Sequence, residues 1–544
     1  MNFYFQYLTK KVKSLNSFNG DENVQFIYKE NGNRISLKVK AKEDIKIMTC
    51  FFCINYKYDK ENLLFANGYN SWTFTKEYTL KDKRKDYPNI WLPSFLVKKF
   101  GLKYYGDYFF KNNLKNNIHG FDVGYIKGKE PLFISSLNSK FAYLIINYYV
   151  NENIVVFESD VKELSLKKGD EFVLFDFLLI KDKPIEECFK IYFKFVPKIG
   201  KRNKLVGYCS WYNHFQNINE KIIEEAIDYA LPSYEIIQID DGYETFVGDW
   251  KNIDKNKFPN GLKPLAKKIK NKKLIPGIWV APFICEKKSE IFKNHKDWIA
   301  KDKKEKPFYI GSNWSGYYAL DFYNPEVREY IASCFKYLKE LGFTFFKLDF
   351  LYASSIPSYE GKTRAMVARE SYEFLRDLLK ENIINGCGAV IPSSIGLFDY
   401  MRIGGDVSIT FDDKPYMRLT IKERISTKQT VQNSIFRYIF NEKYFYNDPD
   451  CIILRKENTK LNESQKESLA LINALTGSLF FNSDDLSKYD DNIKKNFNKY
   501  VEIFKNAKDK KFVRNKDSIE INFTLNKEKF NYLYDFKNGL LKRI

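Results

Sequence analysis

The sequence predicts a multidomain protein of α/β and β structure, in which a central (β/α)8 TIM barrel follows an N-terminal β-sandwich and precedes a small C-terminal antiparallel β-domain. Three observations favour this architecture. The chain of 544 residues is long enough for several domains, short alternating apolar runs fill its first part, and strand-like and helix-like segments alternate in its middle. The predicted domain limits are residues 1–195, 196–488 and 489–544.

The N-terminal part, up to about residue 195, consists of short apolar and aromatic runs separated by Gly, Asn, Asp and Lys turns. Examples are "NRISLKVKA", "FAYLIINYYV" and "EFVLFDFLLI". Alternation with a period of two is typical of strands that bury one face. We therefore expect an antiparallel β-sandwich here.

From about residue 200, apolar strands alternate with helical segments. "KLVGYCSW" precedes "NEKIIEEAIDYAL", "EIIQIDD" precedes "GLKPLAKKIKN", and "NPEVREYIASCFKYLKELG" has Pro near its start and Gly at its end, as helices do. Later strands are expected in "DYMRIGGDVS", "DPDCIILR" and "GSLFFNSDD". About eight such strands over roughly 280 residues fit a (β/α)8 barrel. The small C-terminal β-domain is predicted from "KFVRNKDSIEINFTL" and "NYLYDFKNG".

The composition limits the classes of partner. The formal net charge is +20, which raises the possibility of a nucleic acid. However, the lysines are scattered through the chain, and we find no RNP motif, zinc-finger spacing or long arginine-rich run. We therefore expect a lysine-biased soluble surface and no nucleic-acid partner.

Cofactors and membranes are also not expected. The three histidines, His119, His214 and His295, form no HExxH motif or Cys/His cluster, so we expect neither a metal nor another cofactor. No stretch has the 18 or so apolar residues of a membrane helix, and the start lacks the apolar centre of a secretory signal. The eight cysteines are scattered, so we predict a cytoplasmic protein, as a monomer or small homo-oligomer.

Acidic and aromatic residues gather where the predicted barrel strands end. Those ends carry Trp211, Tyr212, Asp240, Asp241, Trp279, Asp349, Cys387, Arg402 and Asp406. In a barrel of this type the carboxyl ends of the strands face the active site. A single Asp in such a loop is often a helix cap, but the whole set together indicates a site.

Asp349 in "FFKLDFL" is the strongest single candidate. Lys347 lies two residues earlier on the same strand, so both side chains point to the same face. A neighbouring ammonium keeps a carboxylate ionised, which suits the nucleophile of covalent glycosidic catalysis. The alternative is a purely structural Lys–Asp pair.

Asp406 in "RIGGDVS" is the best second carboxylate. The two glycines before it allow a sharp turn after the strand, and Arg402 could bind a substrate hydroxyl or orient a carboxylate. The competing carboxylates are Asp399, Asp412 and Asp413.

Several blocks, in order, resemble the α-galactosidases of glycoside hydrolase family 36, which share a clan with family 27. The blocks are "NGYNSW", "QIDDGYETFVGDW", "KFPNGLKPLAKKI", "PGIWVAPF", "YYALDFYNPEVREYI", "FFKLDF", "NGCGAVIP", "MRIGGDVS", "NDPDCIILR" and "SLFFNSDDL". The resemblance runs over most of the chain. It implies a retaining mechanism with Asp349 as nucleophile and Asp406 as acid/base, whose carboxyl groups should lie about 5–5.5 Å apart.

The resemblance also implies which residues hold the sugar. Asp240 and Asp241 would accept hydrogen bonds from the C4 and C6 hydroxyls of a terminal galactose, Lys347 would reach the C3 and C4 hydroxyls, and Arg402 the C2 side. The apolar walls, the pocket floor and the rim would come from Trp279, Trp250, Trp211, Cys387 and Trp72.

The expected activity is that of an exo-α-galactosidase on small oligosaccharides such as melibiose or raffinose. Gly405 stands where many family members have serine or proline, and this difference bears on the room around the C2 substituent. An α-N-acetylgalactosaminidase or a transglycosylase therefore stays open. More distant alternatives are a non-catalytic sugar-binding protein and a nucleic-acid-binding protein.

Overall fold

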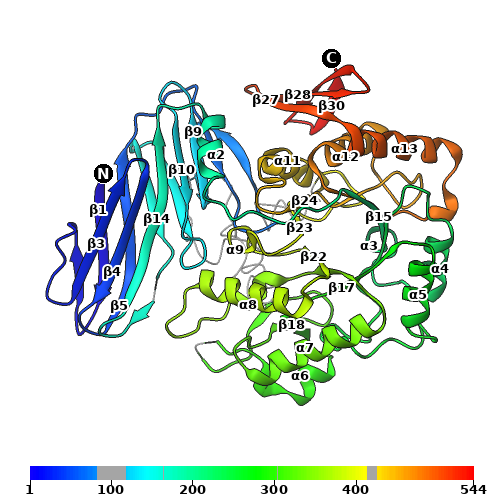
Figure 1. The fold of residues 1–544 in the computed structure, drawn as a ribbon, viewed down its shortest axis with the longest axis horizontal. Helices are drawn as coiled ribbons and strands as arrows, with labels where there is room; N and C mark the ends of the chain where they lie inside the picture. The colour runs from blue at the N-terminus through cyan, green and yellow to red at the C-terminus, as the bar shows by residue number, and fades with distance from the viewer. Residues whose placement is uncertain (83–117, 163, 303, 413–425) are drawn as a thin grey trace.

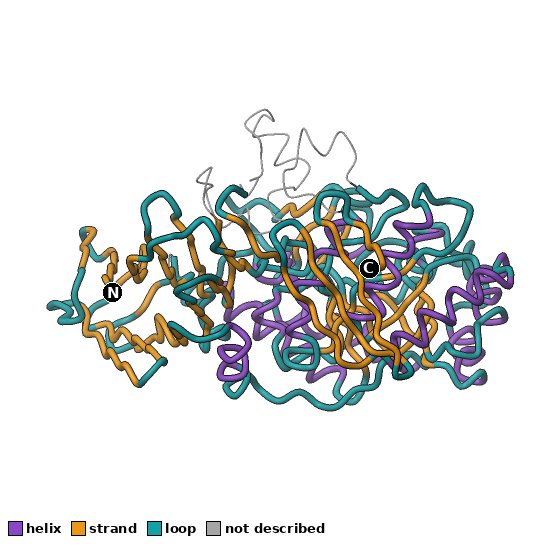
Figure 2. Tube along the Cα trace, turned by 90° about the horizontal axis from the view of Figure 1, so that it is seen from above, coloured by secondary structure: helices purple, strands orange, loops and turns teal. Residues whose placement is uncertain are grey.

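A computed structural model describes residues 1–82, 118–162, 164–302, 304–412 and 426–544. Strands β1 to β14 gather at one end of the molecule, and most of the helices surround a second sheet system at the other end (Figure 1). Seen from above, the strand-rich N-terminal part and the helical part lie side by side along the long axis (Figure 2). The protein is thus divided as the sequence indicates, into an antiparallel first part and an α/β middle.

Two seven-stranded antiparallel sheets form the N-terminal part. The first runs in the order β2 (Val12–Leu15), β1 (Asn2–Leu8), β5 (Ile45–Asn55), β12 (Ile154–Ser159), β11 (Leu144–Tyr149) and β8 (Ile118–Phe121), with β13 (Ser165–Leu166) paired to β5. The second runs β3 (Val24–Asn31), β4 (Arg34–Ala41), β14 (Glu171–Lys181), β10 (Leu132–Ser136), β9 (Val123–Lys127), β6 (Leu63–Ala66) and β7 (Lys76–Thr79). Phe52 of the first sheet contacts Phe175 and Phe177 of the second, with ring centroids 4.8 and 5.9 Å apart. The sheets therefore bury one apolar face of each against the other.

A nine-stranded parallel sheet forms the middle of the chain. Its order is β24 (Tyr446–Asp448), β23 (Tyr400–Arg402), β22 (Ile383–Gly386), β21 (Phe345–Leu348), β17 (Ile275–Val280), β16 (Ile236–Ile239), β15 (Leu205–Cys209), β26 (Leu479–Asn482) and β25 (Cys451–Ile452). The strands are almost wholly buried, as parallel strands are when helices cover them. The predicted alternation of strand and helix is confirmed.

The two edge strands of this sheet are neighbours in the sequence. The predicted strand "DPDCIILR" is broken after its first residue, because β24 ends at Asp448 and β25 begins at Cys451. Pro449 has no N–H to donate to a ladder, and Asp450 has a positive φ of 76°. As a result β24 pairs with β23, whereas β25 pairs with β26 at the opposite edge.

Helices and shorter elements surround the parallel sheet (Figure 1). The α-helices are α2 (Ile185–Tyr192), α3 (Trp211–His214), α4 (Glu220–Asp228), α5 (Lys263–Asn271), α6 (Glu290–Asn294), α7 (Pro325–Glu340), α8 (Arg364–Leu379), α9 (Ile391–Ser394), α11 (Thr427–Arg437), α12 (Glu463–Thr476) and α13 (Asp491–Asn506). Short 3-10 turns are η2 (Lys296–Trp298), η3 (Leu351–Ser355), η4 (Tyr438–Phe440) and η5 (Leu486–Lys488), and a small sheet joins β18 (Ile284–Glu286), β20 (Tyr317–Ala319) and β19 (Tyr309–Gly311).

Local sequence explains where the long helices begin. Asn324 caps α7 by accepting the N–H of Glu326, and Pro325 occupies the first turn, where its missing N–H costs nothing. Asn462 and Gln465 form a capping box at the start of α12. Within the described ranges, none of the helices combines the length and apolar character that a membrane span requires.

The C-terminal strands form a separate antiparallel sheet above α12 (Figure 1). It contains β27 (Lys508–Arg514), β28 (Ser518–Leu525), β29 (Glu528–Asp535) and β30 (Leu540–Arg543). The N–H of Leu541 donates to the Ser468 hydroxyl of α12 at 2.9 Å. The predicted small C-terminal β-structure is confirmed.

One buried arginine joins the N-terminal part to the parallel sheet. Arg437, in the last turn of α11, is 1% exposed. Its guanidinium donates to the carbonyls of Asn70 and Ser71 at 2.9 and 2.8 Å, and to that of Ile403 at 2.7 Å. Since a guanidinium offers five donors in a fixed plane, Arg437 holds the loop that contains Asn70 and Ser71 against the end of β23.

We predict that Arg437→Met lowers the free energy of unfolding by about 3 kcal/mol, because several buried carbonyls lose a charged donor. The control is Arg34→Met, which removes the Arg34–Asp176 pair on the surface and should cost less than about 1 kcal/mol. Arg34 is 48% exposed. Equilibrium urea unfolding measures the stability of both variants. Equal losses of stability would show that Arg437 does not hold the two parts together.

Candidate active site

Carboxylates from three strands meet at the carboxyl edge of the parallel sheet. Asp240 and Asp241 follow β16 directly, Asp349 follows β21, and Asp406 comes four residues after β23. Parallel strands place all their carboxyl ends at one edge, which brings these side chains together. The first three are buried, whereas 48% of the Asp406 side chain is exposed.

Asp240 is held by a buried cation. Lys347 Nζ lies 2.9 Å from Asp240 Oδ2, and the two side chains are 5% and 3% exposed. Gln238 Nε2 donates to the same oxygen at 2.6 Å. The Lys347 side chain of β21 thus faces the interior, as its spacing from Asp349 predicts, but its ion pair is with the residue after β16, two strands away across β17.

Asp349 has both carboxyl oxygens positioned. Trp279 Nε1 donates to Oδ2 at 3.1 Å, and the N–H of Phe350 donates to Oδ1 at 2.7 Å. Burial raises the pKa of Asp349, and the charge of Lys347 and these two donors oppose that rise. The charge of Lys347 therefore favours the ionised form of Asp349, although the ion pair of Lys347 is with Asp240.

Asp241 lies in a second network. Trp314 Nε1 donates to Asp241 Oδ2 at 2.9 Å, and Gln216 Nε2 lies 3.1 Å from the same oxygen. Burial, and then the charge of Asp241, raise the pKa of Glu244 well above its ordinary value. A neutral Glu244 can donate to Asp241, so it adds a third donor to that carboxylate.

Arg402 orients carboxylates. Its NH1 donates to Asp406 Oδ1 at 3.0 Å, its NH2 lies 2.7 Å from Asp450 Oδ1, and its Nε lies 3.5 Å from Asp448 Oδ2. The Arg402 side chain is 3% exposed. Burial raises the pKa of Asp450 to about 6, and the charge of Arg402 opposes that rise. Arg402 is expected from the sequence either to bind a substrate hydroxyl or to orient a carboxylate, and these contacts support the second role.

The first of the two glycines before Asp406, Gly404, is explained by a close approach. A Cβ on Gly404 would lie 2.6 Å from Thr430 Cγ2 of α11. The Thr430 hydroxyl also donates to the carbonyl of Gly405 at 2.6 Å. The loop that carries Asp406 therefore packs tightly on α11.

Two of the competing carboxylates are engaged elsewhere. Asp399 lies at the start of β23, where its oxygens are 2.6 and 2.9 Å from Arg202 and Arg376. Asp412 pairs with Lys428 at 3.6 Å. Asp413 lies outside the described residues.

Three of the aromatic candidates belong to one cluster beside Asp349. Trp279 contacts Trp250 and Trp314, with ring centroids 5.6 and 6.3 Å apart. Phe350 contacts both Trp314, at 5.3 Å, and Trp72, at 5.6 Å, so the N-terminal part reaches the site. Trp250 is 1% exposed and lies behind Trp279 as support.

The remaining two candidates, Cys387 and Trp211, have no contact with the carboxylates in the hydrogen bonds and ring pairs described above. Cys387 is buried, and its N–H donates to the carbonyl of Leu348 at 2.7 Å. Trp211 is half-buried and packs on Phe215 at 5.3 Å. Their contacts with a sugar stay predictions.

Sequence reasoning missed four residues of this network, namely Gln216, Glu244, Trp314 and Asp450. Gln216 and Trp314 lie in loops after β15 and β19, so no strand-end rule points to them. Glu244 and Asp450 stand inside the quoted blocks "QIDDGYETFVGDW" and "NDPDCIILR", which is the only signal they give.

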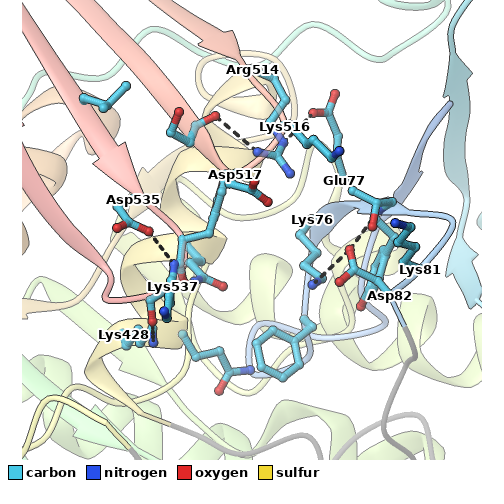
Figure 3. Close-up of a pocket in the computed structure, with 18 of the residues that line it drawn as sticks. Lys76, Glu77, Lys81, Asp82, Lys428, Arg514, Lys516, Asp517, Asp535 and Lys537 are labelled. Atoms are coloured by element: carbon cyan, nitrogen blue, oxygen red, sulfur yellow. Dashed lines mark hydrogen bonds and ion pairs between the residues drawn. The ribbon is translucent and has the colours of Figure 1, made fainter. Parts of the chain in front are cut away.

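A separate charged cavity of about 1070 Å³ lies between β7, α11 and the C-terminal sheet (Figure 3). Its described lining contains none of the strand-end carboxylates. Lys76 lies 3.9 Å from Asp82, and Arg514 lies 3.5 Å from Glu77. Cations and carboxylates alternate and pair there, so the lining favours neither an anion nor a cation.

We predict that Gly388→Ala lowers kcat roughly tenfold, because it would displace Asp349, the expected nucleophile, and a small displacement of such a group is costly. Gly388 has a φ of 55°, and a Cβ there would lie 3.0 Å from Trp72 Cη2 and 3.1 Å from Asp349 Oδ1. The control is Gly361→Ala, with a φ of 67° and open space around the Cβ. If both variants lose the same activity, backbone strain and not crowding is the cause.

We predict that Glu244→Gln reduces the loss of stability at alkaline pH. The raised pKa means that the folded state prefers the neutral acid, so its stabilisation is present at low pH and is lost as pH rises through the folded-state pKa. Glutamine stays neutral throughout. Urea unfolding at about pH 5 and about pH 9 measures the difference. Glu290→Gln, at an exposed glutamate beside Lys293, is the control, and parallel pH profiles for wild type and Glu244→Gln would contradict the prediction.

Comparison with known proteins agrees with this geometry. Residues 208–376 match the Melibiase family. An α-galactosidase of Escherichia coli is 30% identical over 176 residues, which is 31% of this chain and 24% of that protein, and Mel36A of Lactobacillus acidophilus is 25% identical over 197 residues, 33% and 26% of the two chains. The aligned segments thus span about a quarter of these relatives.

The fold is similar over nearly the whole chain. TtGalA, an α-galactosidase from Thermus thermophilus, has a TM-score of 0.71 at 21% identity and covers 95% of this chain and 97% of its own. AgaA, a family 36 α-galactosidase from Geobacillus stearothermophilus, has a TM-score of 0.62 at 14% identity, with 94% and 73% covered. The match of residues 208–376 to the Melibiase family, the α-galactosidase relatives and the shared fold together confirm the resemblance of the chain to the glycoside hydrolase family 36 α-galactosidases.

Proposed function

We propose that the protein is a retaining exo-α-galactosidase that removes terminal α-linked galactose from small galactosides of the melibiose or raffinose type. The observation that carries the proposal is the buried Lys347–Asp240 pair beside Asp349, with Trp279 donating to that carboxylate. A cation, a nucleophilic carboxylate and an aromatic wall on adjacent parallel strands are what recognition and attack of a sugar require.

The fold that supports this activity is inferred to be a closed (β/α)8 barrel. β24 and β25 are separated by two residues and pair with opposite edges of the sheet, which supports closure. In this interpretation β24 and β25 are two halves of one barrel strand. The domain limits at 195/196 and 488/489 stay predictions, as do the cytoplasmic location and the monomer or small homo-oligomer.

In the first step, an oxygen of Asp349 attacks the anomeric carbon as the bond from that carbon to the leaving oxygen breaks. Asp406 gives its proton to the leaving oxygen, and a glycosyl-enzyme ester forms. In the second step, Asp406 takes a proton from water, the water oxygen bonds to the anomeric carbon, and Asp349 leaves. The two environments suit the two roles, since Asp349 is buried and Asp406 is half exposed.

Recognition of galactose rests on fixed polar groups. Asp240 and Asp241 are held by buried donors, and their remaining acceptor capacity is proposed to bind the C4 and C6 hydroxyls. A sugar that misplaces the C4 hydroxyl leaves those carboxylates unpaired, which discriminates strongly. Lys347 would donate to the C3 and C4 hydroxyls.

Solved relatives support a galactoside substrate. TtGalA is known in complex with stachyose and with p-nitrophenyl α-D-galactopyranoside, and a variant of AgaA in complex with raffinose. Among the residues that the structure describes, no contact favours N-acetylgalactosamine over galactose, or a sugar over water as the acceptor. Those alternatives are outcomes of the test below.

The test is hydrolysis of 4-nitrophenyl α-galactoside by wild type and by Asp349→Ala. We expect wild-type turnover, a loss on the order of 10⁴-fold in the variant, and partial rescue by azide with a β-galactosyl azide as product. That product would identify both the nucleophile and retention.

The matched control is Asp399→Ala, which removes a buried carboxylate at the opposite end of β23. It should keep kcat if folded. Full activity in Asp349→Ala would reject the mechanism. Wild-type turnover of 4-nitrophenyl α-N-acetylgalactosaminide alone would reject the galactoside proposal in favour of its nearest alternative.

A further inference from the structure

We propose that Asp450 is a positioning residue that acts through Arg402 and Val407 to aim the proton-donating carboxyl of Asp406 at the leaving group. The inference rests on the proposed function, because it assigns Asp406 the acid role. Asp450 is 1% exposed, and its carboxyl group contacts Arg402, Val407 and Tyr212.

The position of Asp450 follows from the break between β24 and β25. Its φ of 76° turns the chain by a conformation that few non-glycine residues adopt. Asn473 Nδ2 of α12 binds its carbonyl at 3.0 Å, and its own N–H donates to Asp448 Oδ1 at 2.9 Å. The same break that lets the two strand halves pair with opposite edges thus fixes this side chain beneath the Asp406 loop.

Both carboxyl oxygens of Asp450 contact groups next to Asp406, one through an ion pair and the other through hydrogen bonds. Oδ1 lies 2.7 Å from Arg402 NH2, and Oδ2 accepts the N–H of Val407 at 2.8 Å and the hydroxyl of Tyr212. Val407 is the next residue after Asp406. Asp450 therefore holds the backbone on one side of Asp406 directly.

Arg402 provides the second connection. The same guanidinium that binds Asp450 donates through NH1 to Asp406 Oδ1 at 3.0 Å. Because the guanidinium is planar and its donors are fixed relative to one another, anchoring NH2 fixes the direction of NH1. An exposed side chain such as Asp406 would otherwise occupy several rotamers, and losing that freedom before the reaction lowers the barrier.

Asp450→Asn tests the arrangement sharply. Oδ1 of Asp450 pairs with Arg402 and Oδ2 accepts from Val407, so either orientation of an asparagine sets its NH2 against one of these two N–H groups. For substrates of the melibiose type, whose leaving sugar needs a proton, we expect the kcat/KM of Asp450→Asn to fall about 100-fold. α-Galactosyl fluoride should keep most of its kcat/KM, because fluoride leaves without protonation.

The control is Asp399→Asn, the same chemical change at the other end of β23. Asp399 also accepts from two arginines, Arg202 and Arg376, and from the N–H of Ile384 at 2.8 Å. Any loss there should be equal for the two substrates. If Asp450→Asn does not fold, Tyr212→Phe removes a single donor to Asp450 and should give a smaller loss with the same dependence on the leaving group.

Equal losses on both substrates in Asp450→Asn, or no loss on either, would overturn the inference. Wild type that cleaves no α-galactoside, the fluoride included, would reject the proposed function instead. In that case, crystal structures of wild type and Asp450→Asn test the positioning of Asp406 independently of turnover. We expect the Asp406 carboxyl to leave Arg402 NH1 in Asp450→Asn, and an unmoved Asp406 would overturn the inference.

Discussion

Two buried cations allow the carboxyl edge of the parallel sheet to be acidic. Lys347 lies against Asp240, and Arg402 lies among Asp406, Asp448 and Asp450. Buried like charges repel strongly in a medium of low polarity, and each carboxylate needs a cation or several N–H donors to stay there. The placement of those donors decides where every other polar group of the edge can lie.

The N-terminal part contributes to the same edge. Arg437 binds the carbonyls of Asn70 and Ser71, and the next residue, Trp72, packs on Phe350 immediately after Asp349. The Arg437 hydrogen bonds and the Trp72–Phe350 ring contact therefore link a loop of the N-terminal part to the residue that follows the proposed nucleophile. The antiparallel part is thus structurally part of the site and not merely an appendage.

Burial gives the carboxyl groups of this site different chemistry. Desolvation raises the pKa of Glu244 and of Asp349, and only Asp349 has a neighbouring lysine that opposes it. Glu244 consequently serves best as a neutral donor to Asp241.

The sequence by itself determined the antiparallel first part, the strand–helix alternation, and the helix over Pro325–Glu340, because periodicity and capping are local. It also placed Lys347 and Asp349 on one face, since strand side chains alternate. Only the tertiary structure decided that Lys347 pairs with Asp240, that the segment "DPDCIILR" is broken between β24 and β25, and that Trp314 and Asp450 complete the network. Those contacts depend on the register between strands and on loop packing, which no spacing along a single segment encodes.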